Sequence, residues 1–276
     1  MQKILIFSFL LSACALHAMD SADQSRASAQ RADVLSVLQR SIAQVDASLF
    51  AGNIGTIQRN ASLQDLESAH NQACARSSSL RVQKSLFNFV LISSLLNGAD
   101  HENSQEERSL GIAIGKLAHN LELQPAKLTE SEIIAQSLLG LHNSKGNQTR
   151  PSLESVKQAI KEGNAAGFLC HFQALKEDGS KSQVTQIATD LADHYKACQF
   201  AARVLPEFVN FMRATGMASL IAGISINDKP LIKAGTDTLS FFTPLATAMD
   251  MLDLKPAKLV HYQVMHETMQ QFSSDR

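Results

Sequence analysis

The feature that most constrains the fold of this chain is a helical spacing of apolar residues that continues along nearly its whole length. Between Val34 and Leu49, for example, apolar side chains recur every three or four positions, as on one face of an amphipathic helix. No stretch alternates apolar and polar residues with the composition of a strand. The sequence therefore predicts an all-α fold, either an irregular multi-helix bundle or a short helical solenoid, with about ten to twelve helices.

Start signals and prolines divide this pattern into helices. Capping-box patterns at Ser62–Asp65, Ser104–Glu107 and Thr129–Glu132 each predict a helix start. Six prolines are predicted at helix boundaries, because proline is tolerated in a first helical turn and disrupts a helix interior. They are Pro125, Pro151, Pro206, Pro230, Pro244 and Pro256. A polar stretch over residues 143–151 predicts a loop between an N-terminal helical half, 33–142, and a C-terminal helical half, 152–276.

Composition excludes several classes of protein. The chain has 276 residues, of which 45% are hydrophobic and 18% are charged, so it can bury a core and is not a disordered chain. Its 25 basic and 26 acidic residues give a formal net charge of −1. This balance offers no electrostatic surface for nucleic acid or for an anionic membrane.

The N-terminus has the layout of a secretory signal peptide over residues 1–18. Lys3 supplies a positive charge, an apolar run follows from Ile4 to Leu11, and small residues come next. The run at residues 11–14 resembles a bacterial lipoprotein box, which predicts lipidation of Cys14. Cleavage after Ala18 by ordinary signal peptidase is the alternative, and residues 19–32 are predicted to be a flexible segment.

Recognisable catalytic motifs are missing from the sequence, which favours a protein that is not an enzyme. The glycines around Lys116 have the wrong spacing for a phosphate-binding loop. His101 and His266 each begin a zinc-protease pattern but have glutamine where the second ligand belongs.

One candidate metal site remains. His70 and Cys74, and likewise His194 and Cys198, share the pattern His-x-x-Ala-Cys, which places both side chains on one face of a helix. If the two helices met, the four side chains would suit zinc, and a Cys74–Cys198 disulfide is a second interpretation. A third interpretation, ordinary core packing, is favoured because each pair continues an apolar stripe.

A second candidate region spans residues 208–254. Two uncharged runs, Ala214–Asn227 and Thr238–Met249, could form a membrane-active helical hairpin, but each is shorter than the roughly 20 residues that a span needs. A packed hairpin is therefore favoured. Alanines at positions 214, 218 and 222 form a small-residue stripe that is predicted to admit a neighbouring helix closely.

These features lead to three hypotheses about function. The first is an exported, all-helical, non-catalytic protein that binds another protein in the periplasm, at the outer membrane as a lipoprotein, or after secretion. The second is a periplasmic or secreted metal- or disulfide-linked protein that uses His70, Cys74, His194 and Cys198. The third is the membrane-active hairpin. We expect no nucleic-acid partner, no transmembrane helix in the mature chain, and a membrane link only through a lipid on Cys14.

Overall fold

The all-α prediction is confirmed by the structure, a computed structural model that describes residues 28–97, 116, 119–120, 122–147 and 152–274. These residues are almost entirely helical. A first helix covers residues 28–44. The elements that follow are α2 (Ala47–Gly52), α3 (Ile54–Asn60), α4 (Leu63–Asn97), β1 (Leu123–Pro125), α6 (Ala126–Asn147), α7 (Leu153–Glu162), α8 (Ala165–Asp178), α9 (Lys181–Ile226), α10 (Lys229–Met251), β2 (Leu254–Pro256) and α11 (Ala257–Ser274).

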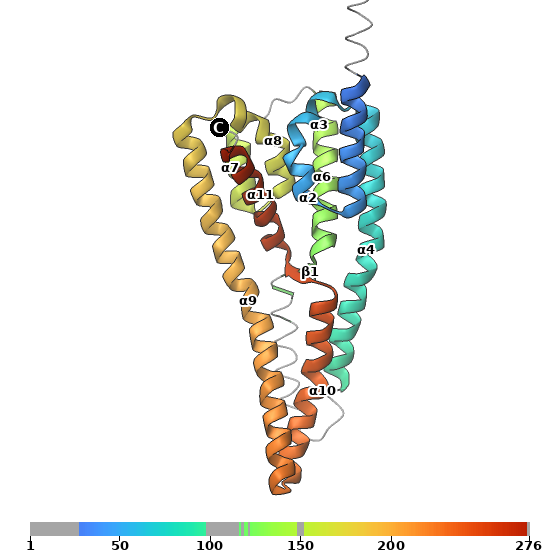
Figure 1. Cartoon of the computed structure of the whole chain (residues 1–276), viewed down its shortest axis with the longest axis vertical. Helices are drawn as coiled ribbons and strands as arrows, with labels where there is room; N and C mark the ends of the chain where they lie inside the picture. The colour runs from blue at the N-terminus through green and yellow to red at the C-terminus, as the bar shows by residue number, and fades with distance from the viewer. Residues whose placement is uncertain (1–27, 98–115, 117–118, 121, 148–151, 275–276) are drawn as a thin grey trace, which may run out of the picture.

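The molecule has a helical head and a long arm (Figure 1). The long helices α4 and α9 run along opposite edges, and α6 and α11 lie between them. The main core fills the head and draws on residues from both halves of the sequence, such as Leu66, Ile133, Phe168 and Met265. The arm is the antiparallel hairpin of α9 and α10 over residues 208–251, and it extends well beyond the head.

The order of elements repeats along the chain. In each half a long helix precedes a short strand that leads directly into a helix, as α4, β1 and α6 and as α9, β2 and α11, with α10 lying between α9 and β2. Residues 122–128 read ELQPAKL and residues 253–259 read DLKPAKL, identical at five of seven positions. Both copies of the His-x-x-Ala-Cys pattern lie on the long helices, α4 and α9. The chain is thus built from two related halves.

The two strands pair with each other at the centre of this repeat. They are antiparallel, with Gln124 opposite Lys255. On either side, the N–H of Ala126 donates to the carbonyl of Asp253, and the N–H of Ala257 donates to that of Glu122. These two bonds are equivalent under a two-fold rotation. The equivalent residues Glu122 and Asp253 also share positive φ angles of 49° and 45°.

The strands were missed by sequence analysis because they are only three residues long, which is too short for an alternating pattern to show. Each ends in a proline, which has no N–H to give to a sheet. The strands can still pair, because in a two-stranded sheet each strand needs backbone N–H donors along one edge only, and the proline nitrogens can lie on the other edge.

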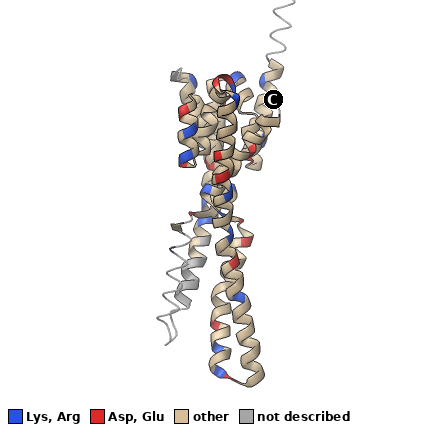
Figure 2. Cartoon of the chain, turned by 90° about the vertical axis from the view of Figure 1, so that its left-hand side faces the viewer, with Lys and Arg blue, Asp and Glu red and all other residues tan. Residues whose placement is uncertain are grey.

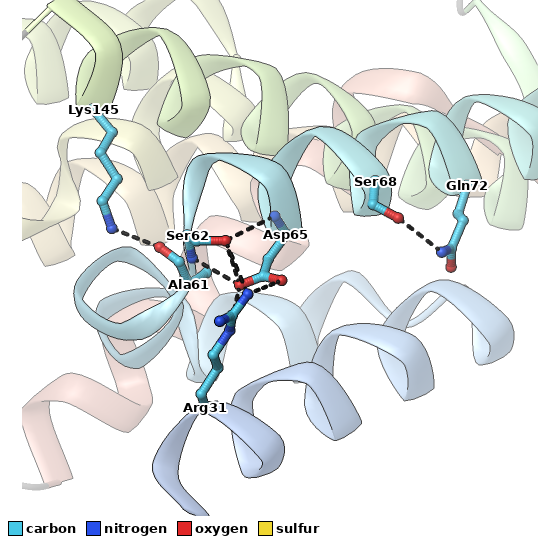
Figure 3. Close-up of polar contacts among 7 residues, drawn as sticks. All are labelled: Arg31, Ala61, Ser62, Asp65, Ser68, Gln72 and Lys145. Atoms are coloured by element: carbon cyan, nitrogen blue, oxygen red, sulfur yellow. Dashed lines mark hydrogen bonds and ion pairs between the residues drawn. The ribbon is translucent and has the colours of Figure 1, made fainter. Parts of the chain in front are cut away.

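The first predicted capping box forms as expected (Figure 3). The Asp65 N–H donates to Ser62 Oγ at 3.1 Å, and the Ser62 N–H donates to the Asp65 carboxylate at 2.9 Å. Arg31 of the first helix donates two further bonds to that carboxylate, and these hold the pKa of Asp65 down, to about 2. Lys145 of α6 donates to the carbonyl of Ala61 at 2.6 Å. These hydrogen bonds connect the start of α4 to the first helix and to α6.

The third predicted capping box, at Thr129–Glu132, is wrong. Helix α6 begins at Ala126, three residues before the predicted start, so Thr129 lies inside it. Thr129 is buried and accepts a hydrogen bond from Gln124 at 2.7 Å, while Glu132 pairs with Arg81 at 3.1 Å. The second box, at Ser104–Glu107, lies outside the described residues.

The prolines divide into two groups. Pro125, Pro230 and Pro256 lie at or just before helix starts, as predicted. Pro206 and Pro244 lie inside α9 and α10, so the predicted helix boundaries at these two positions are wrong. Both are exposed, and packing of the two long helices against each other continues the helix through each proline. Pro151 lies outside the described residues.

The predicted loop also begins later than expected. Helix α6 continues through Asn147, so residues 143–147 are helical. Residues 148–151 lie outside the described residues. The repeated halves of the structure fall on either side of this segment.

Candidate functional site

The two His–Cys pairs lie on α4 and α9, helices at opposite edges of the molecule (Figure 1). The structure brings together the members of one pair, with Cys74 Sγ 3.5 Å from His70 Nε2. It does not bring His70 and Cys74 together with His194 and Cys198. Among the described residues, no group of three or more His, Cys, Asp and Glu side chains is arranged to hold a metal ion.

Each histidine of these pairs instead contacts the inner helix of its own half. His70 Nδ1 lies 2.9 Å from the carbonyl oxygen of Ala135 on α6. The His194 ring stacks on Tyr262 of α11 with ring centres 5.3 Å apart. Cys74 and His194 are exposed, and His70 and Cys198 are half-buried. None of the four side chains is fully buried, which departs from the favoured interpretation of ordinary core packing.

The three described cysteines are all free thiols, so the structure contains no Cys74–Cys198 disulfide. Cys74 is exposed, and Cys198 is half-buried against the main core. Cys170 is buried, and its thiol donates to the carbonyl of Ser137 at 3.5 Å. Burial raises the pKa of Cys170 to about 11, which makes this thiol a poor nucleophile.

The arm is the more distinctive feature, and glycines set its geometry. Gly216 and Gly223 of α9 and Gly235 of α10 are buried where the helices meet. A Cβ atom at Gly235 would lie 2.5 Å from the backbone nitrogen of Leu220, so only glycine permits this approach. The predicted alanine stripe at 214, 218 and 222 is wrong as the contact surface, because all three alanines face solvent.

The glycine contact has a sequence signal of its own. Gly216 and Gly223 are seven residues apart, and so are Gly235 and the buried Phe242. A seven-residue spacing of buried positions is typical of two helices that wind around each other. The four-residue spacing of the alanines predicts the wrong face of α9, whereas the seven-residue spacing of the glycines indicates the contact face.

The outer face of α9 is apolar and exposed to solvent. Among the described residues, seven of the thirteen large hydrophobic side chains that are exposed belong to α9. They are Phe200, Val204, Phe211, Met217, Ile221, Ile224 and Ile226. Phe211 is 66% exposed and Ile221 is 58% exposed. The favoured interpretation of this region as a fully packed hairpin is therefore wrong for α9, because only one face of that helix is covered.

The other helix of the arm has a different surface. The exposed positions of α10 between Lys233 and Thr247 are mostly small or hydroxylated, including Ala234, Thr236, Ser240 and Thr243. Figure 2 shows charged residues at intervals along the arm, including at its tip. The arm thus presents one apolar side and one weakly polar side. A continuous apolar surface of this kind on a soluble protein usually marks an interaction site.

The length argument against a membrane span does not hold for α9. By length and composition, α9 is the one helix among those described that could cross a bilayer, and 17% of its most apolar stretch is buried. The uncharged run seen in the sequence is part of a continuous helix of 46 residues. Cys14 and the rest of residues 1–27 lie outside the described residues.

Comparisons with protein-family models, curated proteins and solved structures find no match to this chain.

Proposed function

We propose that this chain is an exported, non-catalytic helical protein that binds another protein through its arm. The observation that carries the proposal is the exposed apolar face of α9, which includes Phe211 and Ile221. A few residues, often aromatic, supply most of the binding energy in protein interfaces. The near-neutral charge of the chain favours a partner recognised by apolar contact rather than by charge.

Export is the other half of the proposal and rests on the N-terminal sequence. The positive Lys3, the apolar run Ile4–Leu11 and the small residues that follow support a signal peptide. Lipidation at Cys14 would place the arm at the bacterial envelope, whereas cleavage after Ala18 would release the protein. Intact mass of the processed chain distinguishes these two outcomes.

The test compares baits that differ only in the arm. The tagged native chain and a Phe211→Ser/Ile221→Ser variant are each used to capture proteins from envelope and secreted fractions of the host. Both positions are exposed, so the substitutions leave the packing of α9 on α10 intact. We expect quantitative mass spectrometry to show partner recovery falling by about tenfold or more with the variant.

The matched control is Leu139→Ser, which changes an exposed large hydrophobic residue in the head. This variant should recover the partner as well as the native chain does. Recovery that is equal for all three baits, or no specific recovery by the native chain, would contradict binding through the arm.

A second candidate function is membrane activity of the arm, which the length and exposed apolar face of α9 favour. The surface of α10 weighs against it, because Lys229, Lys233 and several hydroxyl groups are exposed there. We expect the native chain to release little dye from liposomes at neutral or acidic pH. Release that is abolished by Phe211→Ser/Ile221→Ser would instead favour membrane activity.

A further inference from the structure

The exposed face of α9 carries a heptad pattern of its own. Nine residues recur at alternating spacings of three and four, and every one is exposed. We call them the outer seam: Ala197, Phe200, Val204, Glu207, Phe211, Ala214, Ala218, Ile221 and Ser225. The seam covers 29 residues, 197–225, and is about 42 Å long. It lies on the side of α9 away from the buried Gly216 and Gly223 that contact α10.

This spacing points to a helix as the occupant of the face. Apolar residues that repeat every 3.5 positions stay aligned with a second helix as the two wind around each other. A lipid surface imposes no such period. Alanines at 214 and 218 add room for a neighbouring backbone, a feature that contact with lipid does not require.

We propose that the occupant is a second copy of this chain, with the outer seams of two α9 helices packed antiparallel. This inference rests on the proposed function, because it names the partner of the arm. The order of side-chain sizes supports it. Large residues, Phe200 and Val204, lie toward the head, and small residues, Ala214 and Ala218, lie toward the tip. An antiparallel pair places Phe200 against Ala218 and Val204 against Ala214 of the second copy.

Oppositely charged residues lie toward the two ends of the seam. Toward the head, the seam continues into the exposed residues Asp190 and Asp193. At the tip of the arm, Lys229 and Lys233 of α10 are exposed, and Asp228 and Asp237 beside them are half-buried. Antiparallel packing brings the end of each arm that carries the two exposed lysines level with Asp190 and Asp193 of the other copy, and it does so twice because the interface is two-fold symmetric.

The shape of the molecule leaves room for this pairing. Helix α9 forms one edge of the molecule along its full length, and the arm extends beyond the head (Figure 1). Antiparallel arms therefore lie side by side with the two heads at opposite ends. Glu207 is the one charged residue of the seam, and its long side chain can keep the carboxylate at the edge of the interface.

The first test is the oligomeric state of the full chain, measured by sedimentation equilibrium across a range of concentrations. We expect a dimer for the native chain. Ala218→Arg, at an exposed site, should weaken the dimer by about a hundredfold or more because it places a charge opposite Phe200. Glu207→Leu should tighten it by about tenfold because it removes the charged residue from the seam.

The matched control is Ala234→Arg, the same substitution at an exposed position on α10 of the same arm. It should leave the dimer unchanged. A native chain that stays monomeric, or a dimer that resists Ala218→Arg, would overturn the proposal. So would equal weakening by both arginine variants.

The second test fixes the orientation with single introduced cysteines. Asn210 is exposed beside the seam and lies close to the two-fold axis of the antiparallel pair, so Asn210→Cys should form a disulfide with its own counterpart. Ser225→Cys should not, because its counterpart would lie at the far end of the interface. Mass spectrometry of the linked peptides separates these bonds from any that involve native cysteines. Linkage at 225 and not at 210 would show parallel packing and overturn the proposed arrangement.

If a different molecule covers the outer seam, these experiments give different results. A monomer that loses a captured partner on Ala218→Arg would assign the seam to another protein, which overturns this inference and leaves the proposed function standing. A monomer that binds neutral phosphatidylcholine vesicles through the seam would assign it to lipid. Protection of the seam by residues 98–115, detected by intramolecular cross-linking, would assign it to the chain itself. The last two outcomes overturn both proposals.

Discussion

At the scale of single residues, His261 is the group that ties the stability of the head to pH. Its ring is largely buried, and burial lowers the pKa of His261 to about 4. Its Nδ1 accepts a hydrogen bond of 3.2 Å from the N–H of Ala165, the first residue of α8. A protonated ring could not accept this bond and would place a positive charge at the positive end of the helix dipole.

The expected consequence is a loss of stability in mild acid. The unfolded chain binds a proton at His261 near pH 6.5, and the folded chain binds it only near pH 4. The free energy of unfolding therefore falls as the pH drops through this window, by on the order of 3 kcal/mol from this residue. Denaturant unfolding at several pH values should show a shallower decline for His261→Asn, whose amide oxygen can still accept from Ala165.

Comparing the pH dependence of stability in the native chain and in His261→Asn separates the contribution of His261 from that of other titratable groups. Burial also lowers the pKa of His171, which adds a decline in the same direction to both chains. An identical pH dependence for the native chain and His261→Asn would show that the ring is not titrating in this window.

At the scale of helices, the arm depends on glycine at the contact of α9 and α10. A Cβ atom at Gly235 would lie 2.7 Å from the carbonyl oxygen of Gly216 and closer still to the backbone of Leu220. We expect Gly235→Ala to push the helices apart and destabilise the arm by about 1–3 kcal/mol, more than the helix-forming tendency of alanine restores. Hydrogen exchange over residues 208–251 should rise, while the head stays protected.

The control for this substitution is Gly146→Ala in α6. A Cβ atom there meets nothing within 4 Å, so alanine should stabilise the helix by about 0.5–1 kcal/mol. If Gly235→Ala and Gly146→Ala both leave exchange in the arm unchanged, the close approach of α9 and α10 is not what holds the arm together.

At the scale of the whole molecule, the helical class was predictable from sequence and the arrangement was not. Apolar spacing identifies helices one at a time, as it did for residues 34–42, because it reports which face is buried. It does not report what covers that face. The runs after Ala214 were therefore interpreted as packed on all sides, although one face is open. The helix boundaries predicted at Pro206 and Pro244 were wrong for a related reason. Packing between the two long helices outweighs the local tendency of proline to interrupt a helix.

The repeat was the largest feature that sequence analysis left unused. The matched segments 122–128 and 253–259 were visible in the sequence. Without the strand pairing that joins them, nothing connected them to the paired His-x-x-Ala-Cys patterns. A coincidence of ligand types was interpreted as a possible zinc site, whereas the structure places the two patterns on helices at opposite edges of the molecule (Figure 1).

Pro206, just before the start of the arm, makes the arm a lever. Pro206 leaves the carbonyl of Ala202 without its helical hydrogen bond, so α9 bends more easily there than elsewhere. Ile226 is twenty residues after Pro206 along the helix, a length of about 30 Å. A change of about ten degrees in direction at Pro206 would move the tip by about 5 Å, given that length. Small rotations near the head are thus converted into displacements at the tip that are as large as a side chain.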